Sequence, residues 1–149
     1  MKTKVIFSSL LCLMMAQNLF AELPKLNELT PQAKAKISDK VLSKDEIMQG
    51  AERTQNLYIF CLSQTAEKLK MMYPDAKKEI IYDTLSTACE YPEDIFSIYN
   101  ILLAASSMNK PMSEKQASVF LEDSYKKQGR EKSNGELRNE ILKSLKIIE

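Results

Sequence analysis

Two cysteines on either side of a predicted helix break constrain the fold of this chain more than any other feature. Cys61 lies 13 residues before Pro74, and Cys89 lies 15 residues after it. The proline separates two stretches that each have a helical pattern, 43–73 and 75–89. At about 1.5 Å of rise per residue, both sulfur atoms would sit about 20 Å from the turn, level with each other on antiparallel helices. The spacing therefore predicts a helical hairpin closed by a disulfide between Cys61 and Cys89.

The N-terminal residues have the three-part pattern of a secretory signal peptide. A basic start precedes the 12-residue apolar run 5–16, and a small residue, Ala21, precedes the first acidic side chain. The run is too short to span a bilayer, which takes about 20 residues, and the alternative is a signal anchor that stays in the membrane. We expect removal of a signal peptide at 1–21, no stable membrane insertion afterwards, and a periplasmic or secreted location. Residues 22–149 are then expected to form a single helical domain.

Export also bears on the redox state of the cysteines. Cys12 leaves with the signal peptide, and the mature chain then holds only Cys61 and Cys89. An even cysteine count in an exported protein favours a disulfide, and the alternative is two buried free thiols. A disulfide between Cys61 and Cys89, which are 28 residues apart, should stabilise the fold by about 3–4 kcal/mol.

Helix start and stop signals predict an all-α fold, a small irregular bundle of about six helices that includes the disulfide-closed hairpin. No segment shows the alternation that is typical of strands. Gly129 is the expected C-cap of the fifth helix. The uncharged stretch 95–108 is expected to be the central helix, and the alternative is a helix left partly bare for a partner. The six predicted helices begin at Thr30, Ser43, Asp75, Tyr91, Ser113 and Ser133, three of them at capping boxes.

The composition argues against most kinds of catalysis. The chain contains no histidine, which removes the usual catalytic triads and most zinc sites. It has three glycines and no glycine-rich phosphate loop. The carboxylate pairs fall at helix starts or on polar faces, although a glycosidase that uses two of them stays open. We expect no enzyme, no cofactor and no metal site. Nucleic-acid binding is not expected either, because acidic residues interrupt the basic run 126–132.

Charge is distributed unevenly along the chain. Residues 79–109 contain five acidic and no basic side chains, a net charge of −5, whereas 22–78 and 110–149 carry +2 each. One interpretation is a solvated acidic face on the third helix. The sharper hypothesis is an exposed acidic docking surface beside the disulfide. Its candidate partner-binding residues are Glu90, Glu93 and Asp94.

These features together favour a small exported protein whose ligand is another protein. Within that class, we expect an inhibitor or immunity protein that neutralises a toxin or hydrolase of the cell envelope. The outline resembles the small helical, disulfide-bearing immunity proteins that protect against peptidoglycan-cleaving effectors, but no residue pattern of theirs is matched. The alternative is an accessory or chaperone of pilus or secretion-apparatus assembly. A third hypothesis is a carrier that holds a small apolar ligand inside the bundle.

Overall fold

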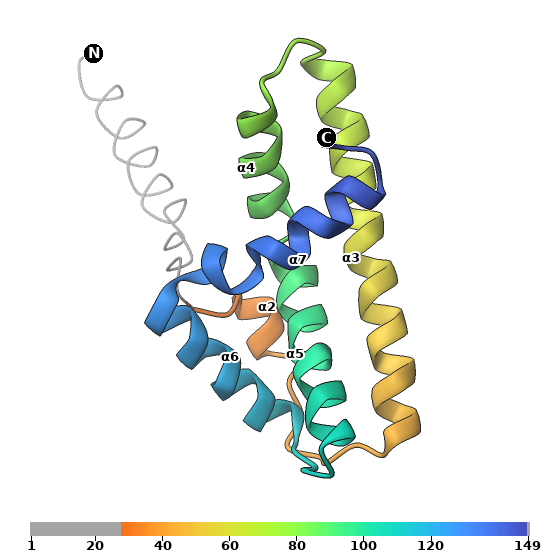
Figure 1. The fold of residues 1–149 in the computed structure, drawn as a ribbon, viewed down its shortest axis with the longest axis vertical. Helices are drawn as coiled ribbons and strands as arrows, with labels where there is room; N and C mark the ends of the chain where they lie inside the picture. Colours follow the sequence, from red (N-terminus) through yellow and green to blue (C-terminus); the bar gives the residue numbers. More distant parts are fainter. Residues whose placement is uncertain (1–27, 149) are drawn as a thin grey trace, which may run out of the picture.

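A computed structural model describes residues 28–148, and within this range it contains six α-helices and no strand (Figure 1). The predicted all-α bundle is confirmed. The predicted signal peptide lies outside the described residues. None of the helices in 28–148 is long and apolar enough to cross a membrane. The helices are α2 (Pro31–Lys34), α3 (Lys44–Met72), α4 (Lys78–Ala88), α5 (Glu90–Ser107), α6 (Glu114–Gln128) and α7 (Arg130–Ser144).

The predicted hairpin is formed by α3 and α4. A capping box opens α3: the Ser43 hydroxyl accepts from the Glu46 N–H at 3.3 Å, and the Glu46 carboxylate accepts from the Ser43 N–H at 2.8 Å. The chain leaves the helix at Tyr73, and Pro74 begins the turn that leads into α4. Helix α3 runs along nearly the full height of the molecule, and α4 lies opposite its upper part (Figure 1).

The disulfide between Cys61 and Cys89 is confirmed, with an S–S distance of 2.06 Å and 5.9 Å between the Cα atoms. Cys89 is the single residue between α4 and α5. The bond therefore attaches the junction of α4 and α5 to the middle of α3, and it limits movement at the base of the hairpin, away from the turn at Pro74.

Helix α5 is the central helix of the bundle, as the uncharged stretch 95–108 predicts. It packs most extensively against α3 and also contacts α6 and α2. Two apolar cores meet along it. One core contains Tyr58, Leu62, Ala66, Leu69, Leu85, Cys89, Phe96, Ile141 and Leu142, and the other contains Leu29, Ala33, Ile47, Ile98, Leu102, Ala117, Leu121 and Tyr125.

Three predicted helix boundaries are wrong, and the first of them is the start of α4, which lies at Lys78 rather than Asp75. The pattern of 31–42 predicts a first helix through Leu42, but the helix stops at Lys34, and part of the segment that follows is held against the start of α6. There the Lys115 N–H donates to the Ser38 carbonyl at 3.1 Å. The last helix begins at Arg130 rather than after a box at Ser133. The confirmed cap Gly129, with φ of 82°, turns the chain directly from α6 into α7.

Candidate functional site

The three acidic residues expected on the surface lie at the start of α5, and two of them are buried. Glu93 and Asp94 are only 2% and 0% exposed to solvent, and Glu90 is half-buried. The expectation of an exposed acidic docking surface is therefore wrong for Glu93 and Asp94. The reason is that helix α7 crosses the start of α5 and covers it with two arginines, Arg130 and Arg138.

Asp94 is saturated with hydrogen bonds. Its Oδ1 atom accepts from Arg130 Nη1 at 2.6 Å and from the Tyr125 hydroxyl at 3.0 Å. Its Oδ2 atom accepts from the Thr30 N–H at 2.8 Å and from Arg130 Nη2 at 3.3 Å. Arg130 also donates to the Glu28 carbonyl at 2.8 Å. The aspartate thus connects α5, α6, α7 and the segment before α2 at one point.

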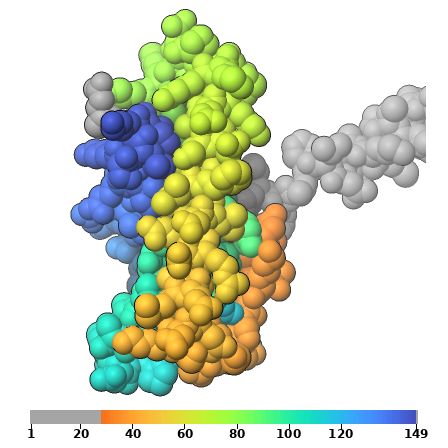
Figure 2. All heavy atoms as spheres, turned by 90° about the vertical axis from the view of Figure 1, so that its right-hand side faces the viewer, coloured from red at the N-terminus to blue at the C-terminus, as the bar shows by residue number. Residues whose placement is uncertain are grey.

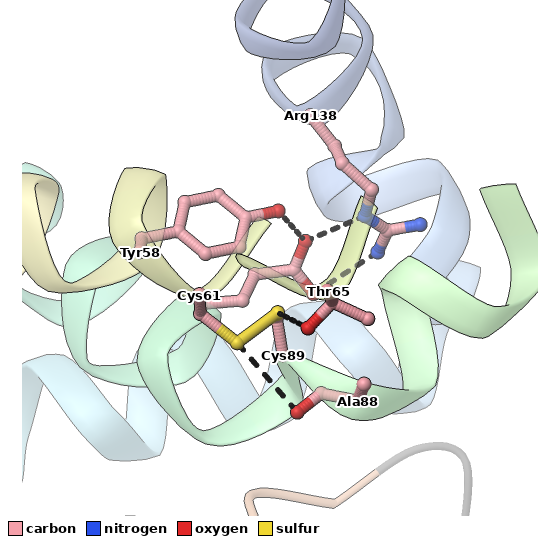
Figure 3. The surroundings of a disulfide bond; sticks show 7 residues. Tyr58, Cys61, Thr65, Ala88, Cys89 and Arg138 are labelled. Atoms are coloured by element: carbon pink, nitrogen blue, oxygen red, sulfur yellow. Dashed lines mark hydrogen bonds and ion pairs between the residues drawn. A yellow bond between two sulfur atoms is a disulfide. The ribbon is translucent and has the colours of Figure 1, made fainter. Parts of the chain in front are cut away.

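Glu93 makes a parallel set of bonds toward the hairpin. Its Oε1 atom accepts from the Tyr58 hydroxyl at 2.8 Å and from Arg138 Nε at 2.8 Å, and its Oε2 atom accepts from Arg138 Nη2 at 3.0 Å. Figure 3 shows Tyr58 and Arg138 converging beside the disulfide between Cys61 and Cys89. The carboxylate of Glu93 therefore connects α3, α5 and α7 near the disulfide.

The environment of this ionic cluster explains the protonation of its members. Burial and the charge of Glu93 raise the pKa of Tyr58, and burial and the charge of Asp94 raise the pKa of Tyr125. Burial disfavours the charged form of Arg138, but the hydrogen bond and charge of Glu93 outweigh it and raise its pKa. The two tyrosines of the cluster are therefore neutral phenols at neutral pH, and Arg138 is a charged guanidinium.

The cluster accounts for the uneven charge of the sequence. Two of the five acids in 79–109 are neutralised by arginines that lie 36 and 45 residues further along the chain. The arginines themselves were missed, although the sequence carries a signal for them. The chain has only three arginines against 18 lysines, and Arg130 and Arg138 are eight residues apart, on one face of a helix. Their contacts stabilise the fold and leave these carboxylates unavailable to a partner.

The most conspicuous apolar surface lies at the opposite end of the hairpin from the disulfide. Four large apolar side chains are exposed there: Met71 at 80%, Met72 at 63%, Tyr73 at 61% and Ile80 at 56%. Figure 2 shows that this end of α3 and α4 stands at one extremity of the molecule, beyond α7. We call these four residues the hairpin tip.

The hairpin tip borders a groove of about 650 Å³. Its walls are mainly apolar and come from both helices and the turn: Leu69, Met72, Tyr73, Pro74, Ile80 and Ile81. Two other exposed apolar residues, Phe60 in the middle of α3 and Phe120 on α6, do not line this groove. An exposed apolar groove with large side chains around it is typical of a surface that binds another molecule.

Within residues 28–148 there is no cluster of three or more side chains that could hold a metal ion. Comparisons of the chain with protein-family models, with curated proteins and with solved structures give no match.

Proposed function

We propose that this protein is an exported protein-binding protein that neutralises a toxin or hydrolase in the cell envelope, and that it binds this partner through the hairpin tip. The observation that carries the proposal is the exposure of Met72, Tyr73 and Ile80 on the walls of one groove, next to the exposed Met71. Methionine and tyrosine are side chains that protein interfaces favour, because they offer large adaptable contact areas.

The shape of the molecule supports an inhibitor over an assembly factor. The hairpin tip is narrow and projects from the body, whereas enzyme active sites are concave and largely apolar. The disulfide between Cys61 and Cys89 and the hydrogen bonds of Glu93 with two other helices hold the base of the hairpin in place. A projection that is already ordered loses less conformational freedom when it enters a cleft.

The envelope location is supported by two features of the chain. The N-terminal pattern of a basic start, an apolar run and Ala21 is typical of exported proteins. The disulfide is the kind of covalent bond that persists in oxidising compartments such as the periplasm.

An inhibition assay tests this proposal. The mature protein is added to an envelope extract of the source cells, and the release of soluble fragments from peptidoglycan is measured. We expect the native protein to reduce the rate and Met72→Glu to abolish the effect, because a buried unpaired charge would disrupt an apolar contact.

The matched control is Val119→Glu, which places the same charge on an exposed apolar residue of α6. This variant should inhibit as the native protein does. Unchanged hydrolysis with the native protein, or equal inhibition by the native protein and Met72→Glu, would refute the proposal. Capture of a pilus or secretion subunit by the hairpin tip, without inhibition, would favour an assembly accessory instead.

A further inference from the structure

A second cavity, remote from the hairpin tip, lies between the first half of α3 and the central helix α5. Its volume is about 390 Å³, which falls within the range of small-molecule sites. It is lined by residues of α3, α5, the segment between α2 and α3, and the first residue of α6. The cavity is independent of the surface proposed to bind a protein.

The sequence of α3 explains why the two helices leave this space between them. At the cavity, α3 presents Gln49, Arg53 and Thr54, none of which is a large apolar side chain that could fill it, whereas the Tyr99 ring lies against Gly50. Opposite them, α5 presents a stripe at helical spacing that is made of Tyr91, Ile95, Ile98 and Tyr99. The cavity therefore has an apolar and aromatic wall on one side and a polar wall on the other.

The two carboxylates of the cavity are already engaged with other groups. Glu46 accepts from Lys40 Nζ at 2.6 Å and from the Ser43 N–H at 2.8 Å. Glu114 accepts from the Tyr99 hydroxyl at 2.7 Å and from the Ser38 N–H at 2.9 Å. These contacts use the acidic groups to fix the surrounding segments.

The two cations of the cavity have no such partners. Neither Arg53 nor Lys36 forms a salt bridge with any residue of 28–148. Lys36 Nζ lies 5.2 Å from the centroid of the Tyr91 ring. Arg53 is the third arginine of a chain that otherwise relies on lysine, and the other two hold buried carboxylates. A guanidinium group is suited to binding a carboxylate through two parallel hydrogen bonds.

We propose that this cavity binds a small organic carboxylate with an apolar or aromatic body. The carboxylate would pair with Arg53 and be attracted by Lys36, while the body would lie against Tyr91, Ile95 and Ile98. This places a ligand site on the protein in addition to its protein-binding surface.

The experiment uses a charged probe and its uncharged counterpart of nearly the same shape, 2-naphthoate and 2-naphthamide. Each is titrated into the mature protein, and the amide signals are followed by two-dimensional NMR. We expect 2-naphthoate to bind about tenfold more tightly than 2-naphthamide, a difference of about 1.4 kcal/mol. The shifted signals should belong to residues 49–54 and 91–99.

Two variants make the result specific. Arg53→Gln removes the charge from an exposed side chain, and it should weaken binding of 2-naphthoate about five- to tenfold while leaving 2-naphthamide unaffected. Lys68→Gln removes a charge from α3 outside the cavity and should change neither. Equal affinity for the two probes, shifts outside the cavity, native affinity in Arg53→Gln, or no binding at about 1 mM probe would overturn the proposal.

Discussion

Arg138 on α7 donates two parallel hydrogen bonds to Glu93 on α5, from Nε to Oε1 at 2.8 Å and from Nη2 to Oε2 at 3.0 Å. Both residues are almost fully buried. The same carboxylate accepts the hydroxyl of Tyr58 on α3. This ion pair therefore helps to fix how the last helix lies across the hairpin, together with the pair of Arg130 and Asp94.

Removal of one member of this pair should be strongly destabilising. Arg138→Met leaves the carboxylate of Glu93 buried without its main partner, and breaking such a pair costs about 3–5 kcal/mol. Urea unfolding should show this loss in the free energy of unfolding. The control Lys143→Met alters an exposed residue of the same helix and should change stability by less than about 0.5 kcal/mol.

The double variant Glu93→Leu with Arg138→Met tests the cause of that loss. Without either charge, no ion remains buried and unpaired, and the double variant should be more stable than the sum of the single changes predicts. Additive effects of the two changes would contradict the pairing.

The disulfide should contribute a large part of the stability. Replacing Cys61 and Cys89 together by alanine opens a loop with a sequence separation of 28. The chain-entropy relation gives a loss of about 3–4 kcal/mol for a loop of this size. Thermal unfolding followed by circular dichroism measures it. A variant that melts at the native temperature would show that the ionic cluster alone fixes the junction at Cys89.

Local signals allowed much of the fold to be predicted from the sequence. The capping box at Ser43, the break at Pro74 and the spacing of the two cysteines depend on neighbouring residues or on helix geometry, and all three are present in the structure. The box at Ser133 failed because the helix already begins at Arg130, whose side chain is held by Asp94 of α5. The Ser133 hydroxyl donates to the Gly129 carbonyl at 2.9 Å, within a helix that began earlier.

Gly50 allows α5 to approach α3 closely, and its replacement provides a further prediction. A Cβ atom at this position would lie 1.9 Å from Cε1 of the Tyr99 ring. Glycine to alanine usually stabilises a helix interior by about 0.5–1 kcal/mol, but here the ring must move, and overpacking costs about 1–3 kcal/mol. We expect Gly50→Ala to be destabilised in urea, and Gly50→Ala with Tyr99→Leu to recover part of the loss. Stabilisation by Gly50→Ala alone would contradict the close contact.

Stability should fall in alkaline solution because of the tyrosines. Burial and hydrogen bonds to Glu131 and Glu114 raise the pKa values of Tyr82 and Tyr99 to about 12, above the usual value of 10. A raised folded-state pKa gives stability that is fully present below pH 10 and is lost as the pH rises from about 10 to 12. Tyr99→Phe should reduce the loss of unfolding free energy per pH unit between about pH 10 and 12. Tyrosinate absorbance and circular dichroism, recorded together, measure ionisation and unfolding as the pH rises. An equal loss of stability with pH in the native protein and in Tyr99→Phe would contradict the role of Tyr99.

The candidate site was harder to predict than the fold, and the reason is physical. Acidic residues near the start of a helix, such as Glu93 and Asp94, are favoured by the helix dipole whether they are exposed or buried. Which of these holds depends on distant residues, here Arg130 and Arg138. The hairpin tip was also missed, because Met71, Met72 and Tyr73 continue an apolar pattern that elsewhere in α3 faces the core.

The most direct test of the proposed function locates the partner on the surface. A photoreactive benzoylphenylalanine is placed at Met72 in the hairpin tip and, as a matched control, at Phe120 on α6, which is equally exposed at 63%. The protein is irradiated in the envelope of the source cells, and cross-linked products are identified by mass spectrometry. We predict a cross-link from position 72 to an envelope toxin or hydrolase and none from position 120. A cross-link to the same partner from position 120 alone would contradict the hairpin tip as the binding surface.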